Sequence, residues 1–179
     1  QSGGIGLSVI NNDDKSGLTV NMDNLKVTLA DGTVAYYDVF DSAATPEPVD
    51  VTYTWTEQLN SYTLAGTTYE PTAVSAGDYT ISTQCDRTSV YAWLNGTATV
   101  DGENLDVDQT WTDYTVEVKV QRDASNDNLS GAIAGRVTPV YDTDNQLQGY
   151  EYYQIRILGN SVRLHKLYWN GTKIADSGK

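Results

Sequence analysis

The chain has 179 residues, enough for one β-sandwich domain, and its 24 acidic and 11 basic residues give a net charge of −13. This charge repels polyanions, so it argues against nucleic acids and anionic membrane surfaces as partners. The sequence contains no run of about 18 apolar residues, the length that a membrane-spanning helix needs. The single cysteine, Cys85, cannot form an internal disulfide. We therefore expect a soluble protein, outside the cell or on its surface, from which any export signal has been removed.

The first 40 residues predict two-faced β-strands joined by tight turns. Apolar and polar residues alternate here with the period of two that places one face of a strand in a core, and "NNDDKSG" and "ADGT" are typical turn sequences. A few hairpins are marginally stable in water, so these strands must pack on others. The apolar positions of this segment are Ile5, Leu7, Val9, Leu18, Val20, Leu25 and Val27.

Residues 41–50 interrupt this rhythm. They hold two of the four prolines in a stretch rich in Ala, Ser and Thr, and proline removes a donor from a strand ladder. We interpret them as a linker between a strand segment, residues 1–40, and a main portion, residues 51–179.

The main portion repeats the strand pattern. One strand is expected at 114–121, where Tyr114 and every second residue after it are apolar; Tyr153, Ile155 and Ile157 mark another, and Val162 and Leu164 a third. We expect each of these apolar faces to lie in a core. Many short strands separated by Asn, Asp and Gly turns predict an all-β, antiparallel β-sandwich of the jelly-roll type.

From about residue 90 the order "AWLNGTATVDGENLDVDQTWTDYTVEVKV", "SGAIAGRV", "GYEYYQIRIL" and "VRLHKLYWNGTKIADS" resembles the first half of laminin-G-like, concanavalin-type jelly rolls. The closing strands of that family resemble "GGIGLSVINNDDKSGLTVNMDNLKV", which here stands at the N-terminus. The chain is permuted relative to this family, and the family's amphipathic pair before the closing strands has no clear counterpart.

Three arrangements explain such a permutation: a segment of a tandem array, a true permutation within one chain, or strands that complete a neighbouring molecule. A jelly roll without its closing strands exposes strand edges, which the next chain can fill, and a head-to-tail contact that does not close gives a filament. We therefore expect an extracellular structural subunit that polymerises with copies of itself by donating residues 1–40.

The alternative is a carbohydrate-binding module of a secreted multidomain protein, because the resemblance implies carbohydrate-binding relatives. Aromatic rings stack on sugar faces and Arg binds hydroxyl groups. The candidate glycan-binding residues are Arg136, Tyr152, Trp111 and Trp169. Three N-x-[ST] sequons, at Asn95, Asn128 and Asn170, are candidate glycosylation sites.

Catalysis is not expected. A nucleophile needs a positioned base, and the only histidine, His165, lies on the strand face opposite Val162 and Leu164, which predicts an outer sheet surface. The acidic residues cluster in turns, where they stabilise the turn. The chain is therefore interpreted as a binding or structural protein, not an enzyme.

No cofactor is required by this reading, but clustered oxygen ligands suit a structural Ca²⁺ ion. Two loops are candidates, and neither has the spacing of a helix–loop–helix calcium loop. They comprise Asp142, Asp144 and Asn145, and Asn12, Asp13 and Asp14.

Overall fold

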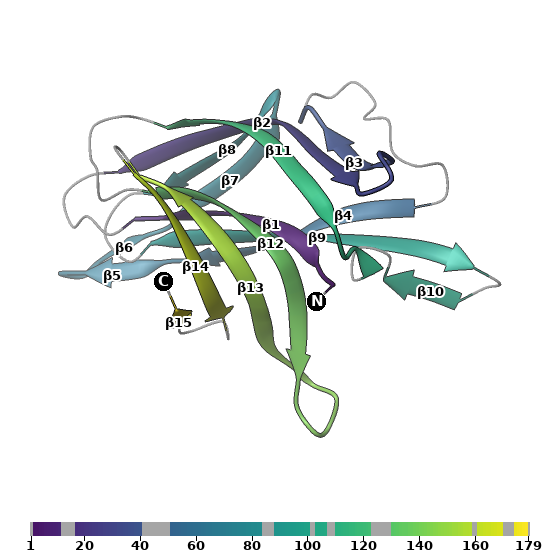
Figure 1. Cartoon of the computed structure of the whole chain (residues 1–179). Coiled ribbons are helices and arrows are strands. Elements are labelled where there is room, and N and C mark those ends of the chain that lie inside the picture. Colours follow the sequence, from purple (N-terminus) through teal and green to yellow (C-terminus); the bar gives the residue numbers. More distant parts are fainter. Residues whose placement is uncertain are drawn as a thin grey trace.

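The computed structural model describes residues 2–11, 17–40, 51–83, 88–100, 103–106, 110–122, 130–158, 161–169 and 174–178. These residues form antiparallel strands in two sheets that pack against each other, together with a short hairpin (Figure 1). The predicted all-β sandwich is confirmed.

The larger sheet has eight strands. Its order is β10–β9–β1–β12–β13–β14–β15, and β4 pairs with the edge of β9 that faces away from β1. These strands are β1 (Gly4–Ile10), β4 (Val51–Asn60), β9 (Ser89–Val100), β10 (Glu103–Asp106), β12 (Ser130–Tyr141), β13 (Leu147–Ile157), β14 (Val162–Trp169) and β15 (Ile174–Gly178).

The smaller sheet has five strands built around β2. The long strand β11 pairs with one edge of β2, whereas β8 and β3 share its other edge, and β7 flanks β8. These strands are β2 (Leu18–Leu29), β3 (Val34–Asp38), β7 (Thr72–Ala76), β8 (Asp78–Thr83) and β11 (Tyr114–Arg122). A separate hairpin consists of β5 (Tyr62–Leu64) and β6 (Thr67–Tyr69).

The main core lies between the two sheets. The alternating apolar residues of β1 and β2 point into it, as predicted, and the inner face of β11 packs against it. Ile5, Leu7, Val9, Leu18, Val20, Leu25 and Val27, the seven apolar positions of the N-terminal segment, are all buried.

A second apolar cluster covers the opposite face of the larger sheet. Tyr91 and Trp93 of β9 pack there with Tyr152 of β13 and Leu167 of β14. His165 belongs to this face and is only 5% exposed, so the expected position on an outer surface is wrong. The cause is the bulk of the aromatic side chains, which makes the second face apolar as well.

The first 40 residues occupy central places in both sheets of their own chain. β1 lies between β9 and β12, and β2 lies between β11 and the β8–β3 edge. The structure of the single chain therefore contains these pairings within one molecule. The expected linker, residues 41–50, lies outside the described residues.

Candidate binding groove

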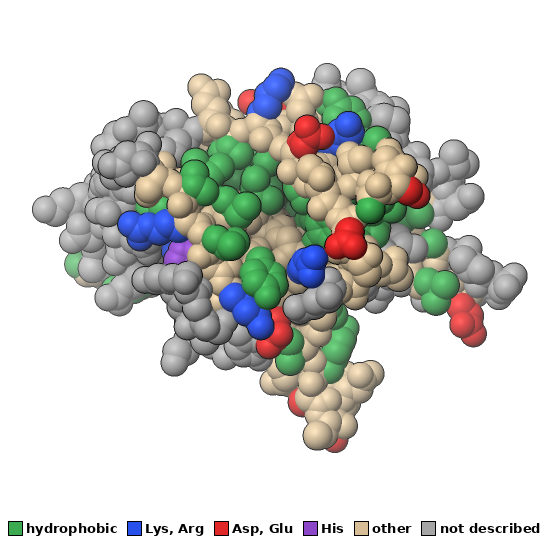
Figure 2. Space-filling view, in the orientation of Figure 1, with side chains coloured by type: hydrophobic (Ala, Val, Ile, Leu, Met, Phe, Trp, Pro, Cys, Tyr) green, Lys and Arg blue, Asp and Glu red, His purple; other side chains and the backbone are tan. Residues whose placement is uncertain are grey.

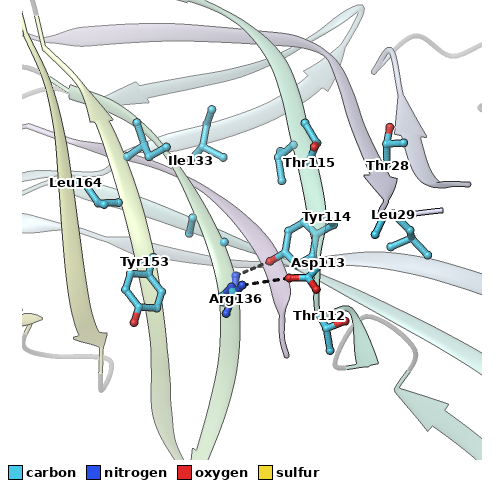
Figure 3. Close-up of a pocket in the computed structure, with 15 residues that line it drawn as sticks. Thr28, Leu29, Thr112, Asp113, Tyr114, Thr115, Ile133, Arg136, Tyr153 and Leu164 are labelled. Atoms are coloured by element: carbon cyan, nitrogen blue, oxygen red, sulfur yellow. Dashed lines mark hydrogen bonds and ion pairs between the residues drawn. The ribbon is translucent and has the colours of Figure 1, made fainter. Parts of the chain in front are cut away.

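The larger sheet extends beyond the edge of the smaller sheet, and a groove lies where its inner face is left uncovered. The smaller sheet ends at β11, but the larger sheet continues past β12 through β13 and β14. The cavity between them has a volume of about 720 Å³ and is lined by β11, by the end of β2 and by the inner faces of β12, β13 and β14 (Figure 3). We call it the β11 groove.

The floor of the β11 groove is apolar. Ile155 of β13 lies directly opposite Leu164 of β14, and Tyr153 lies beside them on the same face. Leu164 is 59% exposed, Ile155 44% and Tyr153 37%, while Val162 of β14 is 68% exposed on that face. A space-filling view shows apolar side chains gathered in this hollow (Figure 2).

These residues were expected to lie in a core, and the structure corrects that expectation. Their face is the core face, because Ile155 is the cross-strand partner of Ile133, which in turn opposes Leu7. These residues are nevertheless exposed, because β11 is the last strand of the smaller sheet and no described strand of that sheet covers the inner face of β13 and β14.

One wall of the groove is the outer edge of β11. In the described part of the chain, β11 pairs with β2 alone, along Tyr114–Arg122. An edge strand presents backbone N–H and C=O groups that another strand can pair with. The β11 groove thus combines a strand edge with an apolar floor, the two features that a β-strand requires of a binding site.

A cluster of polar groups closes one end of the groove (Figure 3). The guanidinium of Arg136 lies 3.7 Å from the carboxylate of Asp113, and both residues line the cavity. The Tyr114 hydroxyl accepts a hydrogen bond from the Arg136 backbone N–H and donates one to the Gly4 carbonyl over 2.9 Å. These bonds join β11 to β1 and β12 and hold the two sheets together at this end.

The predicted glycan-binding residues do not gather at one site. Arg136 lines the groove, but Tyr152 and Trp111 are buried, so neither ring presents a face to a sugar. The side chain of Trp169 lies outside the described residues. Of the two tyrosines that line the groove, Tyr153 is 37% exposed on its floor, and alternation could not identify it as a surface residue because the same pattern marks a core residue.

The candidate calcium loop at Asp142 is a turn between β12 and β13. The Asp142 carboxylate accepts hydrogen bonds from the backbone N–H groups of Asp144 and Gln146 and from the side-chain amide of Gln148. Among the described residues, no three His, Cys, Asp or Glu side chains are grouped as metal ligands would be. Asn12, Asp13 and Asp14 lie outside the described residues.

Of the three sequons, only Asn95 is described, and it lies within β9 and not in a turn. Its side-chain amide donates hydrogen bonds to the Thr56 hydroxyl, over 2.9 Å, and to the Trp93 carbonyl. A glycan linked to this nitrogen would remove at least one of these two bonds, because the glycosylated amide retains a single N–H. Asn128 and Asn170 lie outside the described residues.

Within the described ranges, no helix has the length and apolarity needed to cross a membrane. Comparison of the chain with protein-family models, with curated proteins and with solved structures gives no match. The resemblance to laminin-G-like domains therefore stays a prediction.

Proposed function

We propose that this chain is a non-enzymatic structural subunit, located outside the cell or on its surface, that polymerises with copies of itself by exchanging residues 1–40. The observation that carries the proposal is the position of these residues: one terminal segment supplies a central strand to each sheet. Such a segment is indispensable to a sandwich, and any copy of the chain can supply it.

The pairings of β1 and β2 explain why the segment is needed. Without β1, β9 and β12 lose the strand that joins them, and without β2, β11 loses its only strand partner among the described residues. The exposed edges and apolar faces would then bind the same segment of another copy with the same contacts.

Concentration decides between closure within a chain and exchange between chains. The contacts are identical in both forms, so the difference lies in the linker and in the effective concentration that it imposes, which reaches about 1 mM for short flexible linkers. We expect closed monomers in dilute solution and open chains of exchanged subunits where the protein is concentrated, as at a cell surface.

Carbohydrate binding, the alternative from the sequence, has less support. Two of its four candidate residues are buried, and the groove that contains Arg136 is mainly apolar along its floor. An assembly role uses the strand edge and the apolar floor together, whereas a sugar would use the Tyr153 ring and the polar end of the groove and would leave the edge of β11 unpaired.

A disulfide trap tests the exchange. Thr19 of β2 and Ser82 of β8 are cross-strand partners whose hydroxyl oxygens lie 3.1 Å apart, so a Thr19→Cys/Ser82→Cys variant in a Cys85→Ser background can form a bond only where residues 1–40 dock. After refolding at about 1 mM and oxidation, we expect a ladder of covalent oligomers on a non-reducing denaturing gel. After refolding at about 1 μM, we expect a single monomer band.

Thr63→Cys/Thr68→Cys in the same background is the matched control. These hydroxyl oxygens lie 3.0 Å apart in the β5–β6 hairpin, so their bond stays within one chain and yields a monomer band at both concentrations. A monomer band for the Thr19→Cys/Ser82→Cys variant at both concentrations would contradict the proposed exchange.

A further inference from the structure

We propose that the β11 groove binds the β5–β6 hairpin of a second copy of this chain, which adds two strands to the smaller sheet. This contact rests on the proposed function, because it is a second way in which the subunits join. It differs from the exchange of residues 1–40, because both molecules keep their own folds.

The acceptor surface is the part of the larger sheet's inner face that the smaller sheet does not cover. Tyr153, Ile155 and Leu164 continue the inner surface that the rest of the larger sheet buries under β2 and β11, yet each is more than a third exposed. Contiguous exposed apolar side chains mark interaction sites on soluble proteins. A strand paired with the outer edge of β11 would lie directly over them.

The donor is a preformed hairpin. Ala65 and Gly66 connect its strands with φ angles of 49° and 85°, the two positive values of a type I′ turn, which matches the twist of a β-hairpin. In the described part of the chain, β5 and β6 pair only with each other, and an isolated two-stranded ribbon is marginally stable. Addition to a third strand would stabilise it.

The chemistry of the hairpin suits an apolar floor. Tyr62 and Tyr69 are cross-strand partners on one face, whereas Thr63 and Thr68 are partners on the other. The segment from Ser61 to Tyr69 contains no charged residue, although the whole chain carries a net charge of −13. An uncharged hairpin can approach a second acidic molecule without adding to the repulsion between them.

The position of the hairpin points to a second copy as its partner. The hairpin follows β4, and β4 is separated from β13 within the larger sheet by β9, β1 and β12 (Figure 1). None of the hairpin residues lines the groove of its own chain, so donor and acceptor are separate surfaces of one molecule. Their contact between copies is therefore head-to-tail, and it propagates instead of closing a symmetric dimer.

The test uses a chain in which strand exchange cannot take part. The Thr19→Cys/Ser82→Cys variant, refolded in dilute solution and oxidised, provides this locked monomer, and sedimentation velocity measures its association. Into it we place either Leu164→Glu, which puts a carboxylate on the groove floor, or a shortened hairpin that lacks Thr63, Leu64, Thr67 and Thr68 and joins Tyr62 to Tyr69 through Ala65 and Gly66. The shortened hairpin keeps the two-residue turn.

We expect the locked monomer to self-associate with increasing concentration, and each variant alone to associate about tenfold more weakly or worse, because a buried, unpaired carboxylate is costly. An equimolar mixture of the two variants should form a one-to-one dimer and no larger species, since only one intact hairpin and one intact groove remain. Leu147→Glu is the matched control: Leu147 is 50% exposed but lies outside the groove, so association should not change.

The proposal is overturned if Leu164→Glu associates like the locked parent, or if the mixture stays monomeric. Ile155→Glu provides a second acceptor variant on the groove floor, where Ile155 is 44% exposed, should Leu164→Glu fail to fold. If the disulfide trap gives a covalent ladder but the groove variants associate like the locked parent, strand exchange is supported and only the contact between hairpin and groove is contradicted.

Discussion

Trp93 and Gly6 show how a single residue shapes the second face of the larger sheet. The Trp93 ring lies against Gly6 of the neighbouring strand, and a Cβ atom at Gly6 would lie only 2.5 Å from the ring carbon Cε3. The same Cβ would meet the Ala92 carbonyl at 2.9 Å, which is backbone and cannot turn aside. A glycine is therefore required for the aromatic cluster to lie flat on β1.

Gly6→Ala is expected to lower the free energy of unfolding by about 1–3 kcal/mol, because the added methyl group overpacks a filled site. Urea denaturation monitored by tryptophan fluorescence measures this change. Gly135→Ala is the control, since a Cβ there would meet only the Tyr114 hydroxyl at an ordinary 3.5 Å. Equal stability of both variants would contradict the close packing of Trp93 on Gly6.

Tyr114 connects elements that are distant in the sequence. It lies at the start of β11 in the smaller sheet, and its hydroxyl is hydrogen-bonded to Gly4 of β1 and to Arg136 of β12 in the larger sheet. Arg136 has a φ angle of 54° within a break in the β12–β13 register, which brings its N–H to the tyrosine. This link sets the distance between the sheets at the closed end of the β11 groove.

Tyr114→Phe removes both hydrogen bonds and keeps the ring, so we expect a loss of about 1–2 kcal/mol in the free energy of unfolding. Hydrogen exchange should show faster exchange at β1 and at Arg136 than in the wild type. Tyr141→Phe, at an exposed position, should leave both quantities unchanged. Unaltered exchange at Arg136 in Tyr114→Phe would show that the link does not hold the sheets.

At the scale of the whole molecule, tyrosine side chains are buried on both sides of the larger sheet. Tyr79 of β8 lies in the main core between the sheets, and Tyr91 and Tyr152 lie in the second apolar cluster. Burial raises the pKa of Tyr79, Tyr91 and Tyr152 well above the ordinary value of 10.0, and the hydrogen bond from Tyr79 to Glu57 raises it further there. The folded state therefore keeps protons on these phenols at a pH where the unfolded chain releases them. The corresponding stability is fully present below pH 10.0 and is lost as the pH rises above it.

We expect alkaline unfolding in which these three phenols ionise together with the loss of the fold, seen as a cooperative step in phenolate absorbance that coincides with circular dichroism. Tyr152→Phe should move this step to higher pH, because the Tyr152 hydroxyl makes no hydrogen bond among the described residues and contributes only its ionisation. If all thirteen tyrosines ionised gradually while the chain stayed folded, the burial of Tyr79, Tyr91 and Tyr152 would be contradicted.

Local sequence patterns correctly predicted which residues are buried where the opposing sheet covers the apolar face of a strand. The alternation of Leu18 and Val20 identified a buried face of β2, and the structure buries both. The same reasoning placed Ile155 and Leu164 in a core and His165 on a surface, and the structure reverses this. Alternation reports which residues share a face, but it carries no information on how far the opposing sheet extends.

By itself, the sequence determined the strands, their turns and the class of fold, because side-chain alternation and the Asn, Asp and Gly turns act over a few residues. Only the tertiary structure decided that β1 and β2 lie at the centre of the sheets and that β11 ends the smaller one. Strand order depends on pairing between residues far apart in the chain, so the β11 groove became visible only when both sheets were assembled.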